Sequence, residues 1–162
     1  MSDPSGRADF VRRFGHVAEH SPWVAEEAFA RGPFADRRAL AEAFGEVVRD
    51  APAARQLDLI RAHPDLAGRA ARAGELSAES AGEQASAGLD RLTPADLARV
   101  TSLNAAYRER FGFPFVICVR GRGVAEILSV WEERLAAGPD AERAVAIEEI
   151  AAIIALRLQD AP

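Results

Sequence analysis

One histidine of this chain lies in a position suited to proton transfer. His63 stands directly before Pro64, in the stretch from Ala62 to Gly68, and the chain has only three histidines. Proline fixes its own φ at about −65° and disfavours the helical region for the residue before it, so we expect His63 to end a helix and project from a rigid turn. An imidazole exchanges protons near neutral pH. General acid–base catalysis is one interpretation, and a histidine that caps a helix C-terminus is the other.

A second group of polar side chains follows at Ser80, Glu83 and Gln84, with the spacing i, i+3 and i+4. If a helix begins at Ser77, the hydroxyl, the carboxylate and the amide project from one helix face and could orient a polar ligand. The alternative is a capping box, in which Ser80 is the N-cap and Glu83 bonds back to it. The residues alone leave both interpretations open.

Arg157 is a charged residue late in an apolar segment, between Leu156 and Leu158. A surface arginine is the usual case, but a guanidinium that faces an internal cleft could bind a carboxylate through two parallel hydrogen bonds. His16 and His20 have a spacing compatible with a shared metal ion. Because no HExxH-like pattern accompanies them, we predict no metal site.

Helices must position these groups, since apolar residues recur at helical spacing through most of the chain. Ser21 is expected as the N-cap of a helix that begins at Pro22 and stops by Gly32-Pro33, and Thr93 as the N-cap of one that begins at Pro94. The helices are expected around Phe10–Val17, from Pro22, around Leu40–Val48, around Leu57–Ile60, from Ser77 or Ser80 to about Ala87, from Pro94 to about Arg110, over Val124–Leu135 and from Asp140 to Leu158.

The stretch from Phe111 to Val119 departs from this pattern, because it is apolar, rich in β-branched residues and interrupted by glycine and proline. No second strand accompanies it, so we expect extended backbone that lies against helices. The predicted fold class is all-α, a compact multi-helix single domain over residues 1–162 with one extended apolar segment near 113–119. The last helix has a wide apolar face, which is typical of a central helix or a subunit contact.

Composition narrows the function classes. A length of 162 residues suits one domain, and the net charge of −5 gives no basic face for nucleic acid. No secretory leader and no apolar run near bilayer length is present, so we expect a soluble, cytoplasmic protein without membrane contact. Cys118 is the single cysteine, which excludes an intrachain disulfide, and its apolar neighbours favour a small buried side chain over a reactive thiol.

Taken together, several segments resemble one enzyme family. These are the motifs HPDLAG, ES..EQ..AGL and FGFPFVICVRG, in this order and spacing, with the N-terminal stretch DFVRRFGHVAEHSPWVAEEAF and the final EIAAIIALRLQD. Each motif alone is moderate evidence, but together they are specific. The chain resembles the decarboxylases of 2-oxo-4-hydroxy-4-carboxy-5-ureidoimidazoline (OHCU), which act in urate breakdown, from about Asp9 to Asp160.

The resemblance implies an all-helical fold, commonly a homodimer, that acts on a small ureide without cofactor or metal. It implies that His63 and Glu83 are catalytic, that Pro64 lines the pocket and that Arg157 engages an anionic group. Burying a charge that has no protein partner costs free energy. We therefore expect Arg157 to form a binding site for an anion. Two walls of the pocket are implied, one formed by Ser80, Ala81, Gly82, Glu83 and Gln84, the other by the backbone of Phe115, Val116, Ile117, Cys118 and Val119.

The chemistry implied by the resemblance needs no electron sink from the protein. The substrate carries a hydroxyl and a carboxylate on one ring carbon, next to a carbon–nitrogen double bond that can accept the electrons when carbon dioxide leaves. The enzyme has to hold the carboxylate out of the ring plane and reprotonate one face, which gives (S)-allantoin. Two alternatives are a helical binding or regulatory homologue without turnover, and another lyase or hydrolase that acts on a related ureide.

Overall fold

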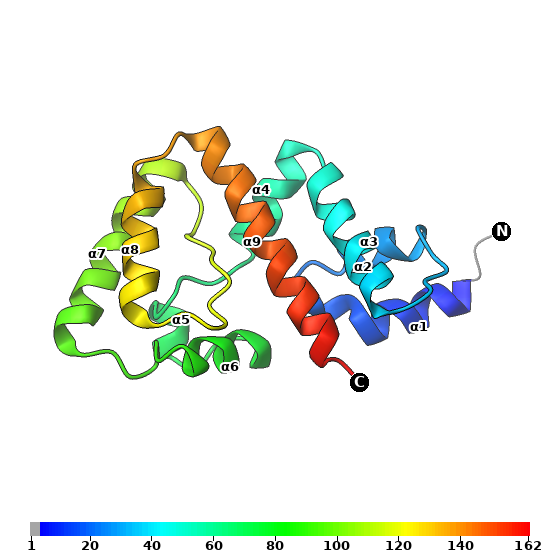
Figure 1. Cartoon of the computed structure of the whole chain (residues 1–162), viewed down its shortest axis with the longest axis horizontal. Coiled ribbons are helices and arrows are strands. Elements are labelled where there is room, and N and C mark those ends of the chain that lie inside the picture. Colours follow the sequence, from blue (N-terminus) through cyan, green and yellow to red (C-terminus); the bar gives the residue numbers. More distant parts are fainter. Residues whose placement is uncertain (1–3) are drawn as a thin grey trace. The chain divides into compact units, whose positions relative to one another are not determined.

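The structure, a computed structural model, describes residues 4–162, and within them it contains helices and connecting segments but no strand (Figure 1). The all-α prediction is therefore confirmed. The helical elements are α1 (Pro4–Phe14), the 3₁₀ helix η1 (Gly15–Val17), α2 (Trp23–Phe29), α3 (Arg37–Asp50), α4 (Ala53–Arg61), α5 (Arg69–Arg72), α6 (Ala78–Ser86), α7 (Pro94–Phe111), α8 (Val124–Leu135) and α9 (Pro139–Asp160).

The chain groups into two compact units. The first unit comprises the described residues up to Ala62 together with Ile147–Pro162, and the second unit comprises His63–Ala146. The helix α9 contributes its first turns to the second unit and the rest to the first. A single domain over 1–162 stays a prediction.

The first unit is built on an aromatic cluster at the contacts of α1, α2 and α3. The ring of Phe10 lies 5.0 Å from that of Phe14, 5.4 Å from that of Phe29 and 6.2 Å from that of Phe44. The helix α9 also contributes buried apolar residues to this unit, whereas Val145 near the start of the helix is exposed. Its buried residues in this unit include Ile147, Ile150, Ile153, Ile154 and Leu158.

The second unit packs α7 against α8, and the segment 113–119 runs beside them as extended, buried backbone. The ring of Phe115 stacks on that of Trp131 at 4.4 Å and meets that of Tyr107 edge-on at 5.4 Å. The predicted extended segment is thus confirmed. Cys118 is half-buried while Ile117 and Val119 are buried, so its side chain is less buried than the sequence predicted.

Two helices, α6 and α7, begin at N-caps that the sequence predicted. The Thr93 hydroxyl accepts a hydrogen bond from the Asp96 N–H at 3.1 Å, and α7 ends at Gly112, whose φ of 74° is a conformation that glycine adopts without strain. The Ser77 hydroxyl accepts from the Ser80 N–H at 3.2 Å. This bond makes Ser77 the N-cap of α6 and decides between the two predicted caps.

The start of α2 differs from the prediction. Its N-cap is Pro22, which makes no side-chain cap, and the Ser21 hydroxyl instead donates to the Glu19 carbonyl at 2.8 Å. The serine is used to close the turn after η1 rather than to cap the helix. The helix also ends at Phe29, before Gly32-Pro33. No helix in the described part of the chain is long and apolar enough to cross a membrane.

Candidate functional site

His63 occupies the predicted position. The helix α4 ends at Arg61 with Ala62 as its C-cap, and His63 lies in the non-helical turn that follows, 6% exposed. We call residues 63–68 the His63 loop. Pro64 is partly buried beside the histidine. A buried imidazole in a proline-restricted turn has the fixed orientation that proton transfer requires.

The His63 loop has a backbone that few residues adopt. Ala67 has a φ of 46°, in the left-handed region that is uncommon for residues other than glycine. A Cβ atom at Gly68 would lie 2.7 Å from the Cβ of Asp65, closer than carbon atoms approach, so glycine is required there by space. Contacts from outside the loop must therefore hold this conformation.

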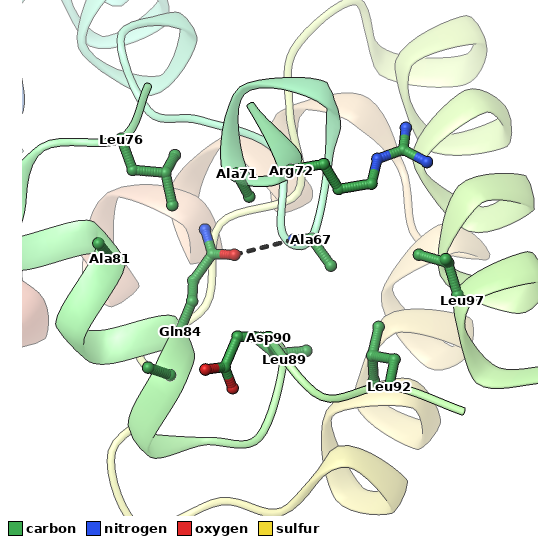
Figure 2. Close-up of a pocket in the computed structure, with 11 residues that line it drawn as sticks. Ala67, Ala71, Arg72, Leu76, Ala81, Gln84, Leu89, Asp90, Leu92 and Leu97 are labelled. Carbon is green, nitrogen blue, oxygen red and sulfur yellow. Dashed lines mark hydrogen bonds between the residues drawn. The ribbon is translucent and has the colours of Figure 1, made fainter. Parts of the chain in front are cut away.

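Those contacts come from α6 and α7. The Oε1 atom of Gln84 accepts a hydrogen bond from the Ala67 N–H at 2.9 Å (Figure 2), and its Nε2 donates to the Asp65 carbonyl at 3.4 Å. From α7, the side chain of Asn104 donates to the Leu66 carbonyl at 3.0 Å. Gln84, predicted from the resemblance as a substrate ligand, is thus bonded to the loop that carries His63.

Arg108 completes this set, since its Nε donates to the Asp65 carboxylate at 3.0 Å. Neither Arg108 nor Asn104 was predicted from the sequence, because polar residues on a helix usually face solvent. Their spacing of four residues, which places them on one face of α7, is the only signal that could have drawn attention to them.

The polar face predicted on α6 is confirmed. Ser80 and Gln84 are buried and Glu83 is half-buried, while Ala81 and Gly82 between them are exposed. With Ser77 as N-cap, Ser80 and Glu83 lie inside the helix. The capping-box interpretation is therefore wrong, and the Glu83 carboxylate is not required to begin the helix.

A cavity of about 570 Å³ is lined by Ala67 of the His63 loop and by Gln84, which is bonded to it (Figure 2). Its wall is mostly leucine and alanine, with Arg72 and Asp90 as charged members. Of the predicted ligand residues, only Ala81 and Gln84 line it, whereas His63, Ser80 and Glu83 do not. The full lining is Ala67, Ala71, Arg72, Leu76, Ala81, Gln84, Ala85, Leu89, Asp90, Leu92 and Leu97.

The second predicted wall, residues 115–119, is anchored by a buried arginine. The Nη1 atom of Arg134 donates to the Val116 carbonyl at 2.7 Å, and its guanidinium lies 4.5 Å from the centre of the Phe115 ring. This carbonyl, expected to face substrate, already has a donor within the protein. Arg134 also donates through Nε to Glu142 at 2.6 Å.

Tyr107 joins this network by donating its hydroxyl to Glu142. Burial, followed by the bond to the Glu142 carboxylate, raises the pKa of the Tyr107 hydroxyl well above its ordinary value. The tyrosine is therefore a permanent donor at neutral pH. None of Tyr107, Arg134 and Glu142 was singled out by sequence.

Arg157 has a protein partner, contrary to the expectation that it would await an anion. The residue is 5% exposed, and its Nη1 donates to Glu19 at 2.9 Å and to the Val17 carbonyl at 3.3 Å. Glu19 itself is 2% exposed. The two residues are 138 positions apart, so no local pattern signals the pair. Binding of a substrate anion by Arg157 stays a prediction.

The arrangement of the described side chains does not support a metal site. Within residues 4–162, no group of three or more histidine, cysteine, aspartate or glutamate side chains is arranged to hold a metal ion. His16 and His20 are accordingly not part of such a group. A reaction without cofactor stays a prediction.

Comparisons with known proteins agree with the resemblance. The family model described as OHCU decarboxylase matches residues 4–159. The OHCU decarboxylase of Amia calva is 49% identical over 94% of this chain and 87% of its own length. The OHCU decarboxylase of Mus musculus is 40% identical over 94% of this chain and 85% of its own length.

Two solved structures are similar as well. A crystal structure of (S)-allantoin synthase has a TM-score of 0.73 and 31% identity, over 95% of this chain and 50% of that chain. A crystal structure of OHCU decarboxylase in the presence of (S)-allantoin has a TM-score of 0.71 over 89% of this chain and 93% of that one, and at 23% identity it shows the fold alone. On the family model and these relatives, the chain belongs to the OHCU decarboxylase family.

Proposed function

We propose that this chain is a carboxy-lyase that converts OHCU to (S)-allantoin in urate degradation, without a cofactor. The observation that carries the proposal is the His63 loop. A buried imidazole stands before a proline, in a loop bonded to the same α6 face that carries Glu83, within a chain of this family. General acid–base catalysis requires a titratable side chain that is held in place near the substrate.

The reaction breaks one carbon–carbon bond. The bond between the ring carbon and its carboxylate breaks, carbon dioxide leaves, and the electron pair moves into the adjacent carbon–nitrogen double bond. The hydroxyl of that carbon then gives up its proton as the carbon becomes a carbonyl, and the nitrogen of the former double bond takes up one proton. The neighbouring ring carbon, which carries the ureido group, takes up another proton from one side. The substrate accepts the electrons itself, so the protein supplies orientation and proton transfer.

His63 and Glu83 are the groups we assign to proton transfer, with Glu83 polarising the substrate hydroxyl. Ser80 and Gln84 orient the ring, and Pro64 lines the pocket beside the imidazole. The backbone of 115–119 is assigned to the ureide, apart from the Val116 carbonyl that Arg134 occupies. Ala81 and Gly82 are exposed on α6 and are the weakest members of the predicted set.

Arg157 is assigned an anionic group of the substrate. The support for this assignment is the match to the family, and the bonds to Glu19 and Val17 give the buried guanidinium a fixed orientation. We further propose a cytoplasmic homodimer. Sedimentation of the purified protein measures the second part of that statement.

The activity is tested by adding the protein to freshly generated urate-oxidation intermediate and following optical rotation. Rapid formation of dextrorotatory allantoin is the expected result, and binding without turnover would indicate a regulatory homologue. His63→Gln should lower kcat by about 10²-fold or more with the fold intact. His16→Gln is the matched control and should keep wild-type kcat. A fully active His63→Gln enzyme would exclude the assigned role.

Glu83→Gln tests the carboxylate separately. It keeps the shape of the side chain but removes its charge, so we expect a large loss of kcat with little change in Tm. Glu79→Gln, on the same helix, is the control. A fall in Tm with unchanged kcat would make Glu83 a structural residue.

A further inference from the structure

We propose that Asn104 and Arg108 of α7 are positioning residues, which set the orientation of the His63 imidazole by holding the backbone of the His63 loop. The inference rests on the proposed acid–base role of His63. Arg108 bonds to Asp65 and Asn104 bonds to Leu66, which are the two residues that follow Pro64.

The loop cannot hold itself in place. Its backbone belongs to no helix, and Ala67 adopts a φ of 46° that alanine alone disfavours. Consecutive residues of the loop instead receive partners from outside it. The Asp65 carbonyl and the Ala67 N–H are bonded by Gln84 of α6, and the Leu66 carbonyl by Asn104 of α7.

The bond from Asn104 is sheltered from water. Leu66 is 7% exposed, and the Asn104 amide reaches its carbonyl at 3.0 Å. A buried carbonyl that loses its donor is destabilised by more than the bond itself contributes, so the loop would move to find another partner. The asparagine therefore selects one loop conformation.

The bond from Arg108 has a different character. Its side chain is 48% exposed and that of Asp65 is 26% exposed, and pairs this exposed add little to global stability. The Arg108 Nε nevertheless lies 3.0 Å and 3.3 Å from the two oxygens of the Asp65 carboxylate. Such a contact fixes the orientation of the Asp65 side chain more than it stabilises the fold.

Pro64 transmits these contacts to His63. Its φ is locked and its presence restricts the backbone of His63, so few soft dihedrals separate Asp65 from the histidine. A shift at Asp65 or Leu66 therefore moves the imidazole. Asn104 and Arg108 are four residues apart on one face of an 18-residue helix, so both contacts share one rigid base.

The test measures kcat, KM and Tm for Asn104→Ala, Arg108→Ala and Arg108→Lys. We expect the two alanine variants to lower kcat by about 10-fold, the scale of a small misplacement of a catalytic group, with KM and Tm little changed. Arg108→Lys keeps a donor for Asp65 and should recover most of kcat. The imidazole signals of His63 in NMR spectra should shift in both alanine variants.

Arg99→Ala is the matched control. Arg99 lies on the same helix, is 47% exposed and pairs with Glu132, which is 50% exposed and lies on α8. Its loss removes a similar ion pair that does not reach the loop, so wild-type kcat is expected. An equal loss of kcat in Arg99→Ala and Arg108→Ala would make the effect one of helix stability and overturn the proposal.

A double-mutant cycle tests the route through Asp65. If Arg108 acts through Asp65, then Asp65→Ala, Arg108→Ala and the double variant should share one kcat, whereas independent effects would multiply. Wild-type kcat in Asn104→Ala and Arg108→Ala, with His63→Gln inactive, would overturn the positioning role and leave the proposed function standing. Activity retained in His63→Gln would instead overturn the proposed function.

Discussion

Two arginines, one in each unit, are buried against glutamates that are themselves almost inaccessible. In the second unit, Arg134 donates to Glu142, which is 0% exposed, and to the Val116 carbonyl. In the first unit, Arg157 donates to Glu19 and likewise to a backbone carbonyl. The two sites have the same composition: a guanidinium, a carboxylate and a main-chain oxygen, all removed from water.

The proposed roles of the two sites are nevertheless different. Arg134 ties the extended segment to α8 and α9 and shares Glu142 with Tyr107, so its role is structural. Arg157 is the residue that the family resemblance assigns to an anion. Burial and a carboxylate partner therefore do not distinguish an arginine that binds substrate from one that stabilises the fold. Substitution of each arginine distinguishes the two roles.

The largest effect is expected at Glu142. Glu142→Ala leaves the Arg134 guanidinium buried without its carboxylate, and breaking a buried pair in this way lowers the free energy of unfolding by about 3–5 kcal/mol. Urea denaturation measures it. Glu142→Gln keeps an acceptor and should be less destabilised. A loss below about 1 kcal/mol in the alanine variant would contradict the structural role given to this network.

The two arginines should respond to lysine in opposite ways. Lysine keeps the charge but not the planar donor pair, so Arg157→Lys should lower kcat/KM by about 10-fold, and Arg157→Ala by more. Arg134→Lys should lower Tm while the folded enzyme keeps its kcat/KM. Wild-type kinetics in Arg157→Lys would exclude bidentate recognition. Wild-type kinetics in Arg157→Ala would remove the residue from the site.

Tyr107→Phe tests how much the hydrogen bond between Tyr107 and Glu142 stabilises the second unit. It removes the hydrogen bond to Glu142 and should lower the free energy of unfolding by about 1.5–3 kcal/mol at pH 7. Burial raises the pKa of Tyr107 in the folded state, so its contribution is fully present below the unfolded pKa of about 10 and declines as pH rises above that value. Urea midpoints of the two proteins should therefore converge above pH 10. A constant difference up to pH 11 would contradict this prediction.

The smallest effect is expected for an exposed pair of the first unit. The Nε atom of Arg49 on α3 donates to Glu148 on α9 at 2.8 Å, and this bond holds the pKa of Glu148 below its ordinary value. Glu148→Gln should lower the free energy of unfolding by only about 0–1 kcal/mol.

The Glu148 prediction is checked by the pH dependence of the stability difference between wild type and Glu148→Gln. A carboxyl group whose pKa is lower in the folded state stabilises the fold at pH values above its unfolded pKa of about 4.3. This contribution is lost as pH falls through the pKa of the folded state. Wild type and Glu148→Gln should therefore converge below about pH 4 in thermal melts. A loss at pH 7 as large as that of Glu142→Ala would remove the distinction between exposed and buried pairs.

Local chemistry made much of the fold predictable. Thr93, Pro94 and Gly112 act on their immediate neighbours, and the structure has α7 between them as expected. The polar face of α6 and the extended segment follow from spacing and composition within a dozen residues. The prediction of Ser21 as an N-cap was wrong because its hydroxyl binds the Glu19 carbonyl instead of the first turn of α2.

Pairs distant in sequence were not predictable. Glu19 and Arg157 are 138 positions apart, and Tyr107 and Glu142 are 35 apart. Each residue alone is compatible with a solvated helix or turn, and only the tertiary fold makes it buried. The same holds for Asn104 and Arg108, whose partners are in a loop about 40 residues earlier. The His63 turn and the polar face of α6 were therefore predictable from the sequence, but the distant residues that bind them were not.

The bond between Gln84 and Ala67 also makes one amide hydrogen a probe of motion. The Ala67 N–H lies outside any helix, yet it is bonded to a buried side chain at 2.9 Å. Its exchange with deuterium requires only that this loop lift from α6, whereas helical amides of α7 require that helix to open. The exchange rate at a single position thus reports how often the histidine leaves its place while the surrounding helices stay folded.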